Sequence, residues 1–147
     1  MEISDLQIGD YVCFCTEEKG YHDCKVCGIF NNLVRVIFGN EETIVSINDI
    51  KPIPLTKRTL RTIGFRYGRT TVVEDLDFGV PMQLPPPCFV YDDAETITVE
   101  FPTESDSGLV TCTGNNTHIA FAFEKISVHE FQHILRMCDI HDLVNKL

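Results

Sequence analysis

The N-terminal third of the chain consists of short apolar runs with strand character. The segments QIGDYVCFC, CKVCGIF, LVRVIFG and ETIVSI alternate or carry β-branched residues, and turn residues separate them at Lys19-Gly20, Asn31-Asn32 and Gly39-Asn40. Four or five strands within roughly fifty residues must curl to bury one face. We therefore expect residues 1–54 to form an SH3-like small β-barrel. Its core candidates are Val12, Phe14, Val34, Val36 and Ile44.

The segment PLTKRTLRTIGF carries the signals of a short helix. Thr56 is a favourable N-cap residue, and Gly64 suits the position just past the last helical turn. Leu60 and Ile63 share one side of this helix, so we expect them to face inward.

The rest of the chain predicts an antiparallel sheet and a closing helix. ETITVEF, GLVTC and HIAFAF read as strands, and a helix follows Ser127. Val128, Phe131 and Leu135 form one apolar face of that helix, which we expect to lie on the sheet. The predicted fold class is α+β: an N-terminal SH3-like small β-barrel followed by an antiparallel sheet with a packed C-terminal helix. The predicted domains are 1–54 and 55–147.

The closing helix contains His129 and His133 in the form H-E-x-x-H. Zincin peptidases place two histidines at this spacing so that both imidazoles reach one zinc ion, with the glutamate as general base. Asp139 stands where the zincins with a short spacing place a third ligand. One reading is therefore a zinc-dependent metallohydrolase with metal ligands His129, His133 and Asp139 and catalytic residue Glu130.

Three features favour a structural reading of the same helix. Ser127 and Glu130 have the spacing of a capping box, which gives the glutamate a structural role. The histidines fall opposite the apolar face, so we expect them to be solvated. Arg136 lies between them in angle, where its charge would repel a dication. We therefore expect no catalytic residue, no metal and no cofactor in this chain.

Four cysteines in the predicted barrel suggest a second candidate metal site. Cys13, Cys15, Cys24 and Cys27 include a C-x-x-C-G sequence, the form of half a zinc knuckle. On a continuous strand Cys24 and Cys27 point to opposite faces, and free cysteine is a common small core residue. Core packing is the favoured interpretation.

The charges are unevenly distributed. The formal net charge is −10, and seven cysteines without an export signal indicate reduced thiols and a cytoplasmic protein. The segment from Thr70 to Glu124 holds no Lys or Arg. Five of the twelve basic residues instead form a stripe consisting of Lys57, Arg58, Arg61, Arg66 and Arg69. We expect this basic stripe to bind a partner.

Three stretches of the chain carry a resemblance. DIKPIPLT, the helix that ends in GF after it, and VHEFQHILRMCDI are similar to segments of a group of small proteins common in Bacteroidetes bacteria and in their phages and mobile elements. That group combines an N-terminal barrel, an IPLT…GF helix, strands and a closing VHELQ-type helix. It often carries Asn at the position of His133, which argues against zinc there. Because the group has no assigned activity, the resemblance implies an architecture and an origin only.

The sequence thus predicts a non-enzymatic accessory protein that binds a protein partner. Two alternatives stay open: a zinc hydrolase using the histidine helix, and nucleic-acid binding through the basic stripe. The net charge of −10 disfavours nucleic acid, because a polyanion needs a clustered positive face. No apolar run is long enough for a membrane helix. The pattern leaves the oligomeric state open.

Overall fold

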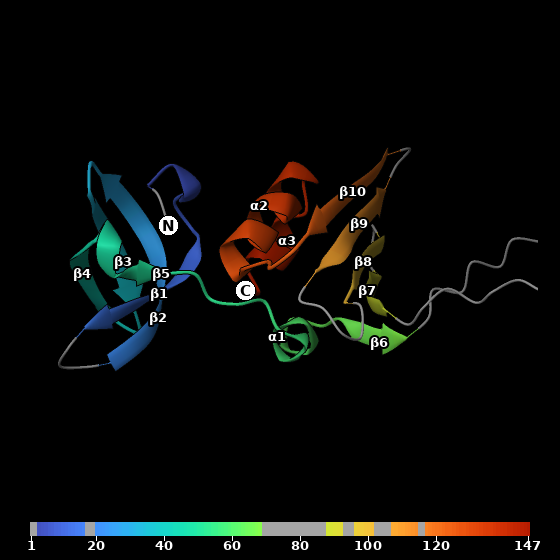
Figure 1. Ribbon diagram of the computed structural model, residues 1–147, viewed down its shortest axis with the longest axis horizontal. Coiled ribbons are helices and arrows are strands. Elements are labelled where there is room, and N and C mark those ends of the chain that lie inside the picture. The colour runs from blue at the N-terminus through green and yellow to red at the C-terminus, as the bar shows by residue number, and fades with distance from the viewer. Residues whose placement is uncertain (1–2, 17–19, 69–87, 93–95, 102–106, 115–116) are drawn as a thin grey trace, which may run out of the picture. The chain divides into compact units, whose positions relative to one another are not determined.

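Two antiparallel five-stranded sheets organise the chain (Figure 1). The computed structural model describes residues 3–16, 20–68, 88–92, 96–101, 107–114 and 117–147. Its contacts define two units, one made of Met1–Leu55 with Ile126–Leu147 and the other of Thr56–Lys125. The mixed α+β class is therefore confirmed. The predicted second domain, 55–147, differs from this grouping, because its last 22 residues (126–147) belong to the first unit.

The first sheet is a meander whose last strand returns to the first. Its order is β4-β3-β2-β1-β5, and the short helices η1 (Ile3–Asp5) and η2 (Ile47–Asp49) precede β1 and β5. Asn31 and Gly39 have φ angles of 51° and 58°, as tight turns between strands require. In the described residues no ladder joins β4 to β5, so a closed barrel is not formed. The strands are β1 (Tyr11–Thr16), β2 (Gly20–Phe30), β3 (Leu33–Phe38), β4 (Glu41–Ser46) and β5 (Ile50–Lys51).

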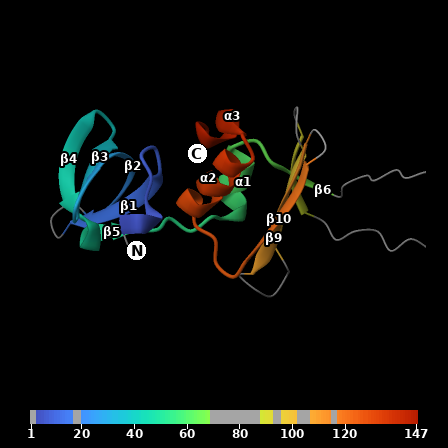
Figure 2. The same cartoon turned by 90° about the horizontal axis from the view of Figure 1, so that it is seen from above.

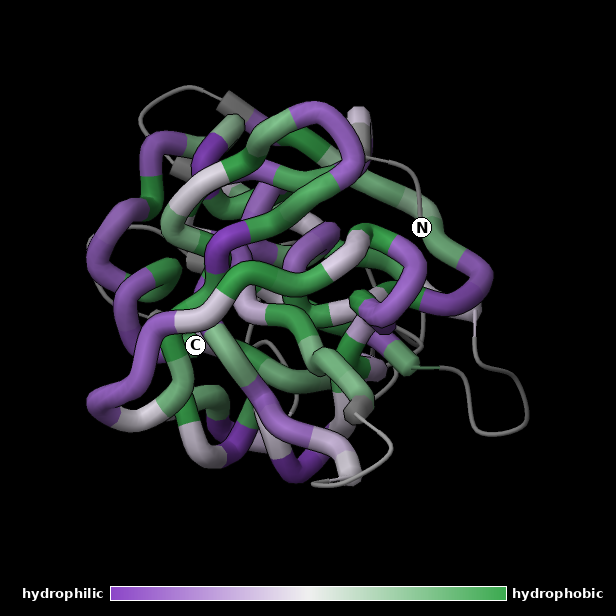
Figure 3. Tube along the Cα trace, turned by 90° about the vertical axis from the view of Figure 1, so that its left-hand side faces the viewer, coloured by the Kyte–Doolittle hydropathy of each residue, from purple (hydrophilic) through white to green (hydrophobic). Residues whose placement is uncertain are grey.

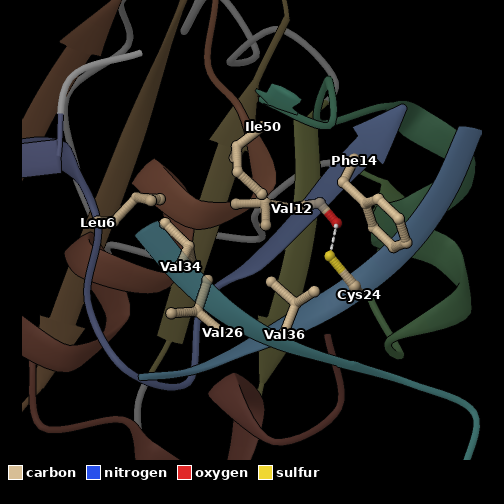
Figure 4. Close-up of a cluster of buried hydrophobic side chains, with 8 residues drawn as sticks. All are labelled: Leu6, Val12, Phe14, Cys24, Val26, Val34, Val36 and Ile50. Atoms are coloured by element: carbon tan, nitrogen blue, oxygen red, sulfur yellow. Dashed lines mark hydrogen bonds between the residues drawn. The ribbon is translucent and has the colours of Figure 1, made fainter. Parts of the chain in front are cut away.

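The concave face of this sheet holds the core of the first unit. Hydrophobic and hydrophilic residues follow one another along its strands, and the inward set forms one cluster (Figures 3 and 4). Four of the five predicted core residues belong to it. Ile44 was predicted wrongly: it is 57% exposed, because it pairs with the outward-facing Arg35 while Val45 points inward. The buried cluster consists of Leu6, Val12, Phe14, Cys24, Val26, Val34, Val36 and Ile50.

The short helix predicted in the second unit is confirmed as α1 (Lys57–Thr62). The Thr56 hydroxyl accepts a hydrogen bond from the Thr59 N–H at 3.1 Å, which caps the first turn. Gly64 has a φ angle of 107°, a conformation that side chains disfavour, and ends the helix. Leu60 and Ile63 are buried as expected.

The second sheet has the order β10-β9-β8-β7-β6. One of its faces is apolar, and Ile97, Val99 and Val110 on the central strands are completely buried. Helix α1 lies on one side of this sheet (Figure 2), with the Arg61 guanidinium 5.9 Å from the centre of the Phe89 ring. The strands are β6 (Arg66–Gly68), β7 (Cys88–Asp92), β8 (Thr96–Glu100), β9 (Gly108–Gly114) and β10 (Thr117–Phe123). Three predicted strands are confirmed as β8, β9 and β10.

The chain closes with α2 (Val128–Met137) and α3 (His141–Val144). Backbone hydrogen bonds join the start of α2 to the residues that follow β5. The Val128 N–H donates to the Ile53 carbonyl at 2.8 Å, and the Leu55 N–H donates to the Ile126 carbonyl at 3.0 Å. The sequence pattern predicts that α2 accompanies the second sheet, whereas these bonds place it in the first unit. No helix in the described part of the chain is long and apolar enough to cross a membrane.

Candidate functional site

The start of α2 is fixed by the predicted capping box. The Ser127 N–H donates to Glu130 Oε2 at 2.8 Å, and the Glu130 N–H donates back to Ser127 Oγ at 3.4 Å. Two backbone donors that the helix itself leaves free are thereby satisfied. Glu130 is thus held by its own helix terminus.

His129 is attached to the same cap. Its Nδ1 lies 2.8 Å from Ser127 Oγ, and Ser127 Oγ in turn lies 2.6 Å from Glu130 Oε2. Two oxygens this close need the hydroxyl proton between them, so Ser127 donates to Glu130 and His129 Nδ1 donates to Ser127. Burial lowers the pKa of His129 below its ordinary value and favours the neutral ring.

The expectation of solvated histidines was wrong. His129 is only 4% exposed, and the His133 side chain is 22% exposed. The helical wheel places both opposite the apolar face, but in the folded chain that second face is also covered. On this face Gln132, His133 and Arg136 bond to the segment from Gln7 to Tyr11. His129 bonds to Ser127 instead.

Asp10 is the centre of those contacts. Its side chain is completely buried, and its Oδ2 accepts from the Gln7 N–H at 2.7 Å and from His133 Nε2 at 2.9 Å. Its Oδ1 accepts from Arg136 Nη1 at 2.5 Å. Burying a carboxylate is costly unless it is paired and hydrogen-bonded, and both conditions are met here. We call Gln7, Asp10, His133 and Arg136 the Asp10 cluster.

Gln132 extends this contact to the first residue of β1. Its Oε1 accepts from the Tyr11 N–H at 2.8 Å, and its Nε2 donates to the Gly9 carbonyl at 3.4 Å. Gln132 is completely buried. Sequence reasoning missed both Gln132 and Asp10, since a glutamine in H-E-x-x-H and an aspartate in a turn carry no signal of a long-range partner.

This geometry bears directly on the zinc reading. His133 commits Nε2 to Asp10, and Arg136 occupies the other oxygen of the same carboxylate. The third proposed ligand, Asp139, is 90% exposed and pairs with His141 Nε2 at 2.8 Å. The structure therefore does not bring the three candidate ligands together. Over the described ranges, no group of three His, Cys, Asp or Glu side chains could hold a metal ion.

The four cysteines of the first sheet do not converge either. Cys24 lies in the core with its thiol donating to the Val12 carbonyl (Figure 4), while Cys13 lies on the opposite face of the sheet, paired with Asp23. Cys27 occupies a β-bulge, where the register of β2 shifts against β3. Burial is the main cause that raises the pKa of Cys24, to about 12, which keeps it a thiol.

The basic stripe lies on the surface of the second unit. Lys57, Arg58 and Arg61 are exposed on α1, and Arg66 is exposed on β6. Among the residues that the structure describes, none of these four cations forms an ion pair. Arg69, the fifth member of the predicted stripe, lies outside the described residues.

No protein-family model, curated protein or solved structure matches the chain.

Proposed function

We propose that this chain is a non-enzymatic binding protein whose basic stripe docks an acidic surface of a protein partner. The observation that carries the proposal is the set of four exposed cations without a carboxylate partner in the described structure, on a chain whose formal net charge is −10. In a chain with 22 acidic residues, exposed cations without a described carboxylate partner favour an acidic ligand from outside.

Two observations favour a protein over a nucleic acid. Phe65, one of the two aromatic residues within the stripe, is buried against Tyr91 with ring centres 5.4 Å apart, so it is not free to stack on a base. Tyr67 is 55% exposed, but its ring already packs against Phe89. In addition, the net charge of −10 opposes a long polyanion more strongly than a local acidic patch.

The architecture supports a further part of the proposal. The order β4-β3-β2-β1-β5, with the short helix η2 before β5, is the order expected of an SH3-like barrel, and we propose that relationship for the first sheet. Together with the resemblance of the two helix segments, it supports an origin in Bacteroidetes bacteria, their phages or their mobile elements. Fold alone assigns no activity, so the function rests on the stripe.

The stripe is tested by reversing two of its charges. The variant Arg58→Glu with Arg66→Glu leaves Arg61 stacked on Phe89, and each exposed change should alter the free energy of unfolding by less than about 1 kcal/mol. The matched control is Lys25→Glu with Lys125→Glu, two exposed lysines outside the stripe. Binding is measured by fluorescence polarisation with a labelled acidic peptide and with a single-stranded oligonucleotide of equal charge.

We expect the acidic peptide to bind the wild type and the control but not the stripe variant. Binding should weaken with added salt, because the screening length falls to about 8 Å at physiological ionic strength. Equal binding by the stripe variant and the control would refute the proposal. Preferential, stripe-dependent binding of the oligonucleotide would replace it with the nucleic-acid function.

A further inference from the structure

Strand β10 is one of the two edge strands of the second sheet. In the described part of the chain its one ladder neighbour is β9, which pairs with all seven residues from Thr117 to Phe123. The other side of an edge strand presents a row of backbone N–H and C=O groups that can pair with a further strand. Apolar residues of β10 are also incompletely covered: Ile119 and Phe121 keep intermediate exposure, whereas their neighbours on the central strands are fully buried.

This edge lacks the features that normally prevent strand addition. The sequence THIAFAF contains no Lys, Arg, Asp, Glu, Pro or Gly. The other three edges are short or charged: β5 has two residues, β6 has three and includes Arg66, and β4 carries Glu41 and Glu42. An edge without charges is also a surface where two copies, each with a formal charge of −10, can approach without placing like charges opposite each other.

We propose that β10 pairs antiparallel with β10 of a second copy of this chain, so that two second-unit sheets join into one continuous sheet. Antiparallel pairing about a two-fold axis places one residue opposite its own copy. The register that pairs all seven residues is centred on Ala120, because it is the middle residue of β10.

The side chains agree with this register. Centring on Ala120 sets Ile119 of one copy opposite Phe121 of the other, twice, and an aromatic residue opposite a β-branched one is a favourable cross-strand pair. On the other face, Ala120 meets its own copy and His118 meets Ala122, so a large side chain is opposite a small one. Along β10 no charged pair arises, which makes this strand complementary to itself.

The experiment uses two charge substitutions at the centre of the proposed axis. Ala120 is exposed. Ala120→Lys and Ala120→Glu each place two like charges opposite one another in the proposed dimer. Sedimentation equilibrium should show a dimer for the wild type and a monomer for each variant alone. An equimolar mixture of the two variants should restore the dimer, because Lys then faces Glu across the axis. The control Thr98→Lys puts the same charge in the same cross-strand row, two strands away from the edge, and should remain dimeric.

Salt separates this contact from one made by the basic stripe. Added salt should strengthen β10 pairing by screening the net negative charge of both copies, whereas it should weaken a stripe contact. Amide exchange along wild-type β10 should also slow as the protein concentration rises, a readout that needs no variant. A wild-type monomer at all concentrations, a dimer unaffected by either Ala120 substitution, or a mixture that stays monomeric while both variants are folded would each overturn the proposal.

Discussion

The Asp10 cluster offers the sharpest test of how α2 is held in the first unit. The substitution Asp10→Asn keeps the size of the side chain and removes its charge. Because Gln7 and His133 donate to one oxygen and Arg136 donates to the other, the new NH₂ group must face a donor in either orientation of the amide. The variant therefore loses hydrogen bonds and also gains a repulsive contact in a fully buried position.

The expected cost follows from the burial of the partners. Removing one member of a buried ion pair typically costs about 3–5 kcal/mol. Arg136 and His133 are 21% and 22% exposed, so water partly solvates them once Asp10 is neutral. We therefore expect a loss of about 3 kcal/mol in the free energy of unfolding, at the low end of that range.

The exposed pair between Arg35 and Glu42 supplies the matched control. Its atoms lie 3.2 Å apart with side chains 41% and 54% exposed, so Glu42→Gln should cost less than about 1 kcal/mol. Both variants are followed in urea by far-ultraviolet circular dichroism, together with amide exchange at Tyr11, whose N–H bonds to Gln132. The two units need not unfold together, and the Tyr11 amide reports on the first unit. If Asp10→Asn costs no more than Glu42→Gln, the cluster does not hold α2.

Further predictions concern the same helix and the core. Glu130→Ala should lower the stability by about 1 kcal/mol through loss of the capping box, and an unchanged urea midpoint would contradict this role. Stability should fall as the pH drops below about 6.5 and again below about 4.5, because folding lowers the pKa of His129 and of Glu130, so that the unfolded chain binds more protons. Burial lowers the pKa of His129. For Glu130, burial raises the pKa, but the hydrogen bonds from Ser127 and the nearby histidines outweigh this effect. A titration of the urea midpoint that is flat from neutral to acidic pH would refute this. Cys24 should react with iodoacetamide only after unfolding, as mass spectrometry of the labelled peptide would show. Protein purified without chelator should contain no stoichiometric zinc; one zinc per chain that disappears in His129→Ala would establish the metal site instead.

The first sheet shows how far alternation predicts a fold. Strand positions and four core residues follow from the pattern, because an inward residue every second position is enough to define a buried face. In strand β4, where Ile44 and Val45 are adjacent and both apolar, the pattern predicted the wrong one as inward-facing. The pairing of Ile44 with Arg35 decides between them, and that pairing depends on the turn at Gly39 rather than on the composition of β4.

The closing helix shows where local patterns fail. Its capping box was predictable because both partners lie within one turn. The partial burial of His133 was not, because its partner Asp10 is 123 residues away along the chain. A helical wheel separates apolar from polar residues, and it predicts solvent on the polar side only when no other element supplies complementary groups. Here a turn before β1 supplies them.

The spacing of the H-E-x-x-H sequence explains why it arises without a metal. Residues three and four positions apart lie on the same side of a helix, which is what a zinc site needs from its two histidines. A spacing of three likewise puts His133 and Arg136, which follows the motif, on one side of the helix, and both reach the carboxylate of Asp10. Glu130 precedes them at the distance that a capping box requires from Ser127. Each polar residue of the motif thus has a partner within the first unit. A zinc ion could bind His133 through Nε2 only after the bond between His133 and Asp10 was broken.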